Sequence, residues 1–343
     1  MINRYADSFY KNRHKNTIYA AHKILKCVFD ILPSSKSIVD IGCGVGTWLY
    51  VAKKYFNVQK VTGYDGEYVP RKYLKINQED FFPSNLEKML FPCDKQYDLA
   101  ICLEVVEHIK PVYADSLVHN LCGLSHVVLF SAAILYQGGT NHVNEQRLSY
   151  WEEKFKKEGY LLADIIRPLI WEDENIPVWY RQNTVIFSDL NIINRKENIK
   201  KDSFVDIVHP DLFERHMEEL KAKYIRVNEM MQQWTLLAIK NISIARWLQE
   251  ENYRRIIVCG KGSLKNILIE DLKNKKICIK KIINDADVDN INREISNIAK
   301  EVDLIIITSI DNCERDYELI ECNKCKIISL ERIIADLFYK YIR

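Results

Sequence analysis

The sequence predicts an α/β protein with two Rossmann-like units, each built on a parallel sheet, joined by a helical connector. The first observation is a β-branched run that ends in Asp40 and is followed by glycines at positions 42, 44 and 46. An amphipathic stretch comes next, so the order indicates a buried strand, a tight turn and a helix N-terminus. The second observation is a similar strand and glycine turn over residues 254–263. The third is the alternation of short apolar runs with helical patterns after each turn, which is typical of parallel sheets.

Length, charge and apolar patterning limit what the chain can do. Its 343 residues allow two domains, and 49 basic against 47 acidic residues give a formal net charge of +2. This balance provides no extended basic field, so we expect no DNA partner. Because the N-terminus lacks a signal-peptide core and no apolar run reaches membrane length, we expect a cytoplasmic protein without a membrane span. The 10 cysteines suggest reduced thiols, and the isolated pair Cys322 and Cys325 supplies too few ligands for a zinc site.

Residues 1–190 are predicted to form the first unit. Apolar residues at helical spacing predict helices over 19–32, 47–55 and 149–158, the last with Trp151 and Phe155 facing inward. Strands are expected at residues 37–41, 60–64, 73–76, 97–103, 126–130 and 184–187.

The pattern Asp40-x-Gly42-x-Gly44-x-Gly46 resembles the first motif of class I S-adenosylmethionine-dependent methyltransferases. A nicotinamide-binding turn spaces its glycines differently. The resemblance to this superfamily extends over roughly residues 9–188, and it implies a Rossmann-like sheet of seven strands with S-adenosyl-L-methionine as the cofactor. In that family the glycine turn and the N-terminus of the next helix receive the methionine part of the cofactor. The resemblance therefore places all four motif residues in the cofactor site.

Further residues fit the cofactor pattern of the resembled family. Asp65 ends the second predicted strand, 19 residues past Gly46, where an acidic residue receives both ribose hydroxyls. After the third predicted strand, the resemblance implies that Asp80 accepts from the adenine amino group and that Phe81 covers the ring. Glu79 is a competing choice for the adenine contact.

The segment Glu104-Val105-Val106-Glu107-His108-Ile109 resembles the fourth motif of the same family, whose strand end lies against the sulfonium. We assign Glu104 to the cofactor site. Residues three and four apart at the start of a helix share a face, so Glu104, Glu107 and His108 can point at one ion. The same pattern, with a later His such as His142, binds a divalent metal in small-RNA 3′-end methyltransferases. It also occurs in metal-free members, where the carboxylates cap the helix, and we favour the metal-free interpretation.

The polar loop after the fifth predicted strand carries our candidate for the general base. Methyl transfer is an in-line displacement, so a sugar hydroxyl needs a proton acceptor close to the methyl group. A histidine of near-neutral pKa is the usual acceptor. His142, in the loop 138–146, is the first choice, His108 is the second, and Glu107 is a further catalytic candidate.

The Gly-Gly-Thr-Asn-His-Val-Asn-Glu-Gln loop and the later Trp-Tyr-Arg-Gln-Asn segment resemble those of methyltransferases found among bacterial surface-polysaccharide and modified-sugar genes. This resemblance implies a sugar, nucleotide-sugar or glycan acceptor. Asn144, Trp179, Tyr180 and Arg181 are expected to bind it. Arg181 can clamp a phosphate or carboxylate in bidentate fashion, and the two aromatic rings can stack on sugar rings. For both aromatic residues, core packing is the alternative.

Residues 191–250 are predicted to contain a linker, at 191–203, and a long helical connector. After Pro210, apolar residues alternate in steps of four and three, a repeat of about 3.5 residues that predicts a coiled-coil-like stripe. Its members are Phe213, Met217, Leu220, Tyr224, Val227, Met231 and Trp234. We expect the helix 211–235 either to pair with its copy in a homodimer or to pack within the chain.

Residues 251–343 are predicted to form a second, small parallel α/β unit. Gly260 and Gly262 match the start of a dinucleotide fingerprint, but Lys265 occupies the third glycine position, which weakens a nicotinamide interpretation. Asp285 stands at a plausible ribose distance. The unit resembles small nucleotide-binding-like domains attached to bacterial glycan-modifying enzymes, and we interpret it as a docking or regulatory module.

Taken with the resemblance, these motifs predict an S-adenosylmethionine-dependent methyltransferase that O-methylates a sugar or sugar-linked group in bacterial polysaccharide biosynthesis. One alternative is a metal-assisted RNA 2′-O-methyltransferase. Another is a noncatalytic scaffold that keeps the methyltransferase-like fold. The intact glycine turn, Asp65 and the Glu-x-x-Glu-His segment argue against a decayed site.

Overall fold

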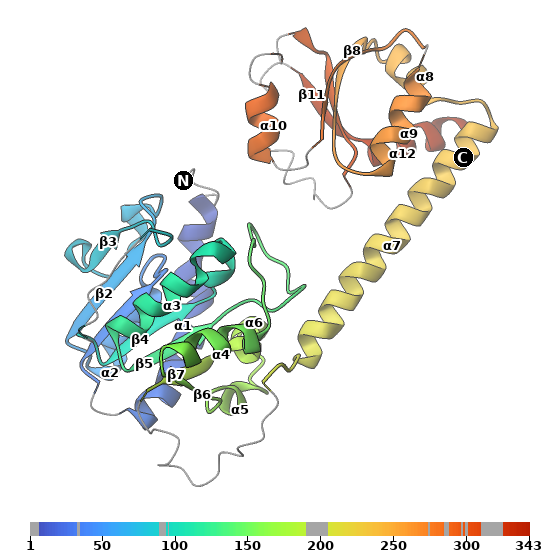
Figure 1. Cartoon of the computed structure of the whole chain (residues 1–343). Helices are drawn as coiled ribbons and strands as arrows, with labels where there is room; N and C mark the ends of the chain where they lie inside the picture. Colours follow the sequence, from blue (N-terminus) through green and yellow to red (C-terminus); the bar gives the residue numbers. More distant parts are fainter. Residues whose placement is uncertain are drawn as a thin grey trace. The chain divides into compact units, whose positions relative to one another are not determined.

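The chain divides into two compact units, Met1–His216 and Met217–Arg343 (Figure 1). The computed structural model describes residues 7–32, 35–88, 94, 96–189, 205–273, 275–284, 288–295, 298, 301–309 and 325–343. Each unit has its own sheet and its own hydrophobic core. The predicted linker lies outside the described residues, and the division at residues 190 and 250 stays a prediction.

The first unit is built on a seven-stranded sheet with the strand order β3-β2-β1-β4-β5-β7-β6. Its strands are β1 (Ser37–Ile41), β2 (Lys60–Asp65), β3 (Phe81–Pro83), β4 (Leu99–Leu103), β5 (Val127–Ser131), β6 (Leu161–Ala163) and β7 (Val185–Ser188). Strands β1 to β5 pair in parallel, whereas β7 lies antiparallel between β5 and β6. The predicted seven-stranded Rossmann-like sheet is confirmed.

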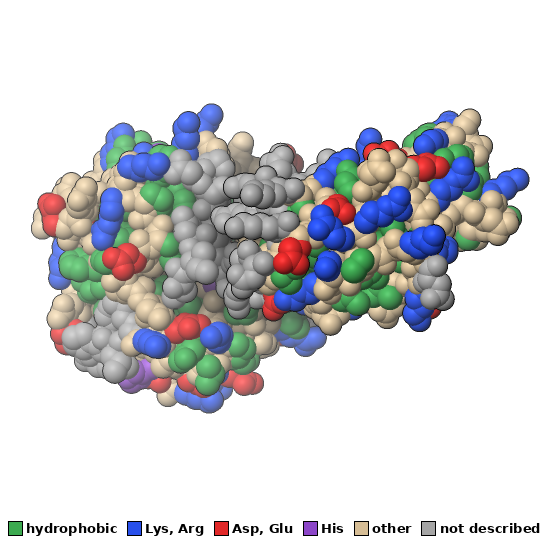
Figure 2. All heavy atoms as spheres, turned by 90° about the horizontal axis from the view of Figure 1, so that it is seen from above, with side chains coloured by type: hydrophobic (Ala, Val, Ile, Leu, Met, Phe, Trp, Pro, Cys, Tyr) green, Lys and Arg blue, Asp and Glu red, His purple; other side chains and the backbone are tan. Residues whose placement is uncertain are grey.

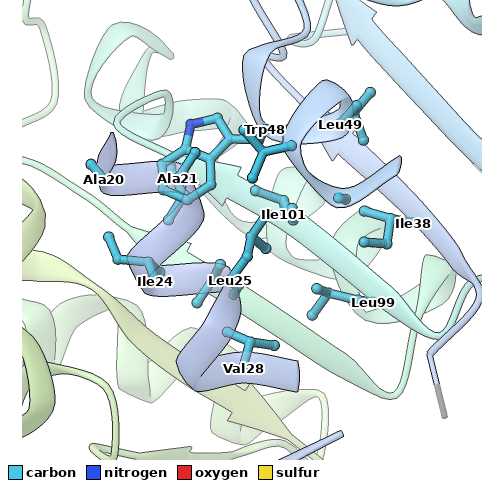
Figure 3. Packing of buried hydrophobic residues seen from close by; sticks show 14 of the residues in the cluster. Ala20, Ala21, Ile24, Leu25, Val28, Ile38, Trp48, Leu49, Leu99 and Ile101 are labelled. Atoms are coloured by element: carbon cyan, nitrogen blue, oxygen red, sulfur yellow. The ribbon is translucent and has the colours of Figure 1, made fainter. Parts of the chain in front are cut away.

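Two layers of helices cover this sheet (Figure 1). They are α1 (Asp7–Ile31), α2 (Thr47–Phe56), α3 (Ala114–Leu124), α4 (Leu148–Lys157), α5 (Arg167–Ile170) and α6 (Val178–Asn183). Helices α1, α2, α5 and α6 share one hydrophobic cluster with one face of the sheet, where Leu25 and Leu49 pack with Leu99 (Figure 3). Helices α3 and α4 cover the other face, and Trp151 and Phe155 are fully buried there, as predicted. Because the helices occupy both faces, the carboxyl ends of the strands are left to the loops that carry the candidate site.

The third strand is not where the sequence predicts it. The prediction of a strand over 73–76 is wrong, because Arg71–Tyr73 is a 3-10 turn (η1) and the strand beside β2 begins at Phe81. The apolar residues of this segment do pack against the core. Their backbone bonds are local, since the Leu74 N–H donates to Arg71 O at 3.2 Å. The apolar run therefore indicated burial without sheet pairing.

The second unit contains a four-stranded parallel sheet in the order β11-β10-β8-β9. Its strands are β8 (Arg255–Cys259), β9 (Cys278–Ile283), β10 (Leu304–Ile307) and β11 (Lys326–Ser329). The accompanying helices are α7 (Pro210–Ile239), which begins before the boundary between the units, α8 (Ile244–Glu250), α9 (Ser263–Leu272), α10 (Val288–Ile295) and α12 (Leu330–Tyr341). The predicted small parallel α/β unit is confirmed.

The glycine turn of the second unit is closely packed. A Cβ on Gly260 would lie 2.2 Å from the Thr308 hydroxyl oxygen. The Lys265 ammonium donates to the side-chain oxygen of Asn284. Asp285 lies outside the described residues, so its ribose role and the interpretation of the unit as a docking or regulatory module stay predictions.

The predicted stripe of helix α7 is buried at one end and exposed at the other. Trp234 packs in the core of the second unit together with Met230 and Leu237. Phe213, Met217, Leu220 and Tyr224 are exposed. Packing within the chain is thus observed for the C-terminal part of the stripe, and the homodimer stays a prediction.

Charged side chains of both signs are found on the surface of the protein. On the face drawn in Figure 2, lysine and arginine side chains are interspersed with acidic, apolar and other side chains. No helix among the described residues is both long and apolar enough to cross a membrane.

Cys325 is disulfide-bonded, so the expectation of reduced thiols is wrong for this residue. Among the described residues, the cysteines that are reduced are Cys27, Cys43, Cys102, Cys122, Cys259 and Cys278.

Candidate active site

The turn between β1 and α2 forms a backbone cradle. Gly42, Gly44 and Gly46 have φ angles of 81°, 55° and 78°, in the left-handed region where a residue with a Cβ is strained. A Cβ on Gly42 would lie 2.3 Å from a methyl group of Val105, whereas a Cβ on Gly44 would meet no described atom within 4 Å. The Gly42 N–H donates to Tyr64 O at 2.7 Å, which ties the turn to β2. Gly44 therefore borders open space that a ligand can enter.

Two buried carboxylates stand beside this turn. Asp40, on β1, is 2% exposed, and its Oδ2 has no hydrogen-bond partner among the described residues. Asp65, at the end of β2, accepts N–H bonds from Gly44 at 2.7 Å and from Gly66 at 2.6 Å. Burial raises the pKa of both carboxyl groups, and the charge of Asp65 raises the pKa of Asp40 further. The structure thus brings Asp40 and Asp65 together with the glycines of the turn, as the sequence predicts for the cofactor site.

A small cavity, partly open to solvent, lies over the turn. Its lining residues are Arg13, Thr17, Asp40, Gly42, Cys43, Gly44, Val45, Thr47, Trp48 and Leu103. Arg13 and Thr17 come from α1, and sequence reasoning missed both. Helix α1 begins twelve residues before the predicted start at Tyr19, and the His14 ring lies 3.2 Å from the Thr47 hydroxyl. The sequence signal that could have found Arg13 was a basic residue ahead of the glycine motif, on a helix that starts earlier than predicted.

Of the residues predicted to contact adenine, Asp80 ends the 3-10 turn η2 (Gln78–Asp80) and Phe81 begins strand β3. Neither is among the residues that line the cavity. The Lys53 ammonium lies 3.3 Å from the carboxylate of Asp80. Phe81 is 3% exposed, and the Arg71 guanidinium lies 4.4 Å from its ring centroid. The adenine contacts of Asp80 and Phe81 stay predictions.

Glu104 does not share a helical face with Glu107 and His108, which corrects the prediction. Its φ is 54°, and the helix expected after it is only the 3-10 turn η3 (Val106–His108). The carboxylate accepts from Gln137 Nε2 at 3.0 Å and from Asn183 Nδ2 at 3.1 Å. Glu104 is therefore turned toward the loop after β5 and toward α6, and it is not among the residues that line the cavity.

Glu107, His108 and His142 do come together. Each offers one ligand atom, and these atoms lie within 4.8 Å of one another. Loop 141–144 is held against this turn, because the N–H groups of Val143 and Asn144 donate to Glu107 O at 2.8 and 3.0 Å. The His108 and His142 rings meet edge to face, with centroids 4.9 Å apart. Three of the four residues of the predicted alternative metal set thus form one cluster.

Burial controls the charges in this cluster. Glu107 is fully buried, and neither carboxylate oxygen has a hydrogen-bond partner within the described part of the chain. Burial, reinforced by the charge of Glu104, raises the pKa of Glu107 well above its usual range. Burial and the neighbouring His142 lower the pKa of His108 to about 4. The positive charge of Arg13 acts on both His108 and Asp65, so the cavity and the cluster share one electrostatic environment.

Arg181, one of the four residues predicted to bind the acceptor, is buried and hydrogen-bonded within the protein. Arg181 is 5% exposed, and its guanidinium donates to Ile176 O and Trp171 O at 3.0 Å each and to Asp211 at 2.6 Å. Its expected role as a substrate clamp is wrong, because its donors bind protein acceptors, of which Asp211 lies at the start of α7.

The aromatic pair packs in the core, and the asparagine stays near the cluster. Tyr180 is 1% exposed and meets Trp48 edge to face at 5.4 Å, while Trp179 packs against the same core. Core packing, the alternative considered for these two residues, is what the structure has. Asn144 is 2% exposed, and its Nδ2 has no hydrogen-bond partner among the residues described. A contact from Asn144 to an acceptor stays a prediction.

Comparison with protein families gives one match. A family model described as a methyltransferase domain matches residues 12–131. The match contains β1 to β5 and the residues from Arg13 to Glu107 and His108, and it ends before the loop that carries His142.

Individual methyltransferases resemble this chain over a short stretch. The (S)-tetrahydroprotoberberine N-methyltransferase of Eschscholzia californica is 32% identical over 99 residues, covering 27% of this chain and 28% of that protein. The ubiquinone biosynthesis O-methyltransferase of Rickettsia bellii is 33% identical over 101 residues, covering 27% of this chain and 39% of the relative. The chain thus spans well under half the length of these curated relatives.

Solved structures similar to this chain include two further methyltransferases. The small RNA methyltransferase HEN1 is 17% identical with a TM-score of 0.37, covering 49% of this chain and 25% of that one. A SAM-dependent methyltransferase from Archaeoglobus fulgidus is 12% identical with a TM-score of 0.40, covering 53% of this chain and 98% of that one.

Proposed function

We propose that this chain is an S-adenosylmethionine-dependent methyltransferase that O-methylates a sugar or sugar-linked group in polysaccharide biosynthesis. The observation that carries the methyltransferase activity is the cradle of Gly42 and Gly44 beside Asp40 and Asp65. It lies at the carboxyl ends of β1 and β2, where open parallel sheets bind their ligands. The sugar class comes from the resemblance of the loop around His142, and it is tested separately.

The residues present fit the cofactor. Gly44 leaves open space over the turn, and the orphaned Oδ2 of Asp40 is a buried acceptor without a partner among the described groups. Arg13 supplies a positive charge for the methionine carboxylate, and Asp65 can accept from the ribose hydroxyls with its remaining lone pairs. When bound, S-adenosylmethionine supplies an electrophilic methyl group on a sulfonium.

The histidine cluster then provides the base. The low pKa of His108 makes its ring a weak proton acceptor, so His142 is the better choice for taking the hydroxyl proton. Glu107 and His108 belong to the same cluster as His142. We infer that Asn144 orients an acceptor oxygen: its backbone N–H donates to Glu107 O, and its buried Nδ2 has no partner among the described residues.

Calorimetry with S-adenosylmethionine, followed by incubation of the chain with labelled cofactor and fractionated cell extract, tests the proposal. We expect binding and a labelled carbohydrate product. His142→Ala should keep cofactor binding and lose turnover by at least about tenfold. His119→Ala is the control, because His119 is exposed and pairs with Glu158 on the surface. A folded chain that binds no cofactor would instead support the noncatalytic scaffold.

The metal-assisted RNA 2′-O-methyltransferase remains a second candidate, because one specific observation favours it. The ligand atoms of Glu107, His108 and His142 lie within 4.8 Å, and the buried carboxylate of Glu107 has no other partner within the described part of the chain. If Mn²⁺ binds there, it should raise the melting temperature of the wild type and not that of Glu107→Gln. Glu158→Gln, on the surface, is the matched control. Chelator-sensitive methylation of an RNA 3′ end would decide for this candidate.

A further inference from the structure

The loop that carries His142 also contains the carboxylate of Glu145, which contacts the histidine ring. Glu145 Oε1 lies 2.8 Å from His142 Nδ1. The same carboxylate accepts backbone N–H bonds from Gly138 at Oε1 and from Tyr136 at Oε2, both at 2.9 Å. Two backbone donors fix the orientation of the carboxylate, so it cannot rotate to follow the imidazole. Because an ionised carboxylate only accepts hydrogen bonds, Nδ1 must carry the proton.

The face of the imidazole ring packs on a glycine. A Cβ on Gly139 would lie 2.3 Å from both Cε1 and Nε2 of His142 and 2.9 Å from Cδ2, and the φ of Gly139 is 153°. The side chains of His142 and Glu145 are 12% and 19% exposed. The pair is therefore largely withdrawn from water, and the missing side chain of Gly139 leaves room for the imidazole ring.

We propose that Glu145 is a positioning residue that holds His142 in its Nδ1–H tautomer and so presents the lone pair of Nε2 to the acceptor. Carboxylates in this arrangement fix the tautomer and orientation of histidines that act as bases or bind metals. The catalytic consequence rests on the proposed function: the acceptor hydroxyl proton moves to Nε2, the Glu145 carboxylate stabilises the resulting imidazolium, and the proton later leaves to water.

The tautomer can be measured without knowing the acceptor. Two-bond 1H–15N correlation spectra of the ¹⁵N-histidine-labelled full-length chain, at about pH 9 where an ordinary imidazole is neutral, identify the protonated nitrogen. We expect Nδ1 protonated and Nε2 unprotonated at His142, with His142→Gln assigning the signals. Glu145→Ala should remove that preference. His126, paired with Asp189 at 2.9 Å, is the internal reference, because the substitution leaves its partner in place.

Two results would overturn the proposal. One is a wild-type His142 protonated at Nε2, and the other is a Glu145→Ala spectrum that keeps the wild-type pattern. If Glu145→Ala disturbs the loop, Glu145→Gln keeps the size of the side chain and removes its charge.

Turnover gives a second readout. In Glu145→Gln we expect kcat to fall by about tenfold or more with the cofactor KM unchanged, and an unchanged kcat would remove Glu145 from this role. A wild-type chain that transfers no methyl group would refute the proposed function. The tautomer experiment would still decide the role of Glu145.

Discussion

Replacing Gly44 by alanine should separate cofactor binding from fold stability. Gly44 has a φ of 55°, and its Cβ would enter open space over the turn. The left-handed conformation costs a residue with a Cβ about 1–2 kcal/mol, which lowers Tm by about 2–8 °C for a domain of this size. The added methyl group would also occupy the space assigned to the cofactor. Overfilling a packed site costs about 1–3 kcal/mol, which corresponds to binding weakened by about 5- to 150-fold.

Gly42→Ala is the matched control, because it carries similar backbone strain in a different environment. The φ of Gly42 is 81°, and its Cβ would lie 2.3 and 2.8 Å from the two methyl groups of Val105. Strain and overpacking together should cost about 2–5 kcal/mol of unfolding free energy. Val105→Ala, added to Gly42→Ala, should recover part of that loss.

The assay combines thermal denaturation with calorimetric titration of S-adenosylmethionine into each folded variant. We expect Gly44→Ala to lose affinity with a small drop in Tm, and Gly42→Ala to lose the larger part of its stability. Wild-type affinity in Gly44→Ala would refute the placement of the cofactor over this turn. Equal losses of Tm in the two variants would refute the packing of Val105 against Gly42.

Two more predictions concern buried charges. Because burial and then the charge of Asp65 raise the pKa of Asp40, its contribution favours the folded state at acid pH and is lost as pH rises toward the folded-state pKa. The Tm advantage of Asp40→Asn over the wild type should therefore grow from about pH 4 to about pH 7, and a constant difference would contradict the burial argument. Arg181→Gln should cost about 2–4 kcal/mol in chemical denaturation, since two backbone carbonyls lose a buried donor. Asp211→Asn should cost clearly less than Arg181→Gln, because the Asp211 side chain is 50% exposed, and equal costs would refute the assignment of Arg181 as an anchor.

Local sequence patterns were sufficient to predict helices and strands, because an element that buries one face carries apolar residues at a fixed spacing. The apolar spacing around Trp151 and Phe155 predicted both the helix and the side that faces the sheet. The alternating glycines predicted a turn with positive φ, since residues with a Cβ are strained there. The segment 73–76 failed because its apolar residues pack from a turn, and burial alone does not specify a ladder.

Side-chain roles were harder to predict, because each depends on partners from other elements. Glu104 lies one turn from Glu107 in sequence, yet its carboxylate is bound by Asn183, 79 residues later. Arg181 has the chemistry of a phosphate clamp, but burial gives its donors to backbone carbonyls.

By itself, the sequence determined that a glycine turn with two acids follows the first strands of a parallel sheet, because turn geometry and strand burial are local requirements. Only the tertiary structure decided that Glu107, His108 and His142 meet, and that Arg13 faces the cradle. It also set Glu145 against the ring of His142. The physical reason is that hydrogen bonding and desolvation are set by groups that the fold brings together, and spacing along the chain does not record them.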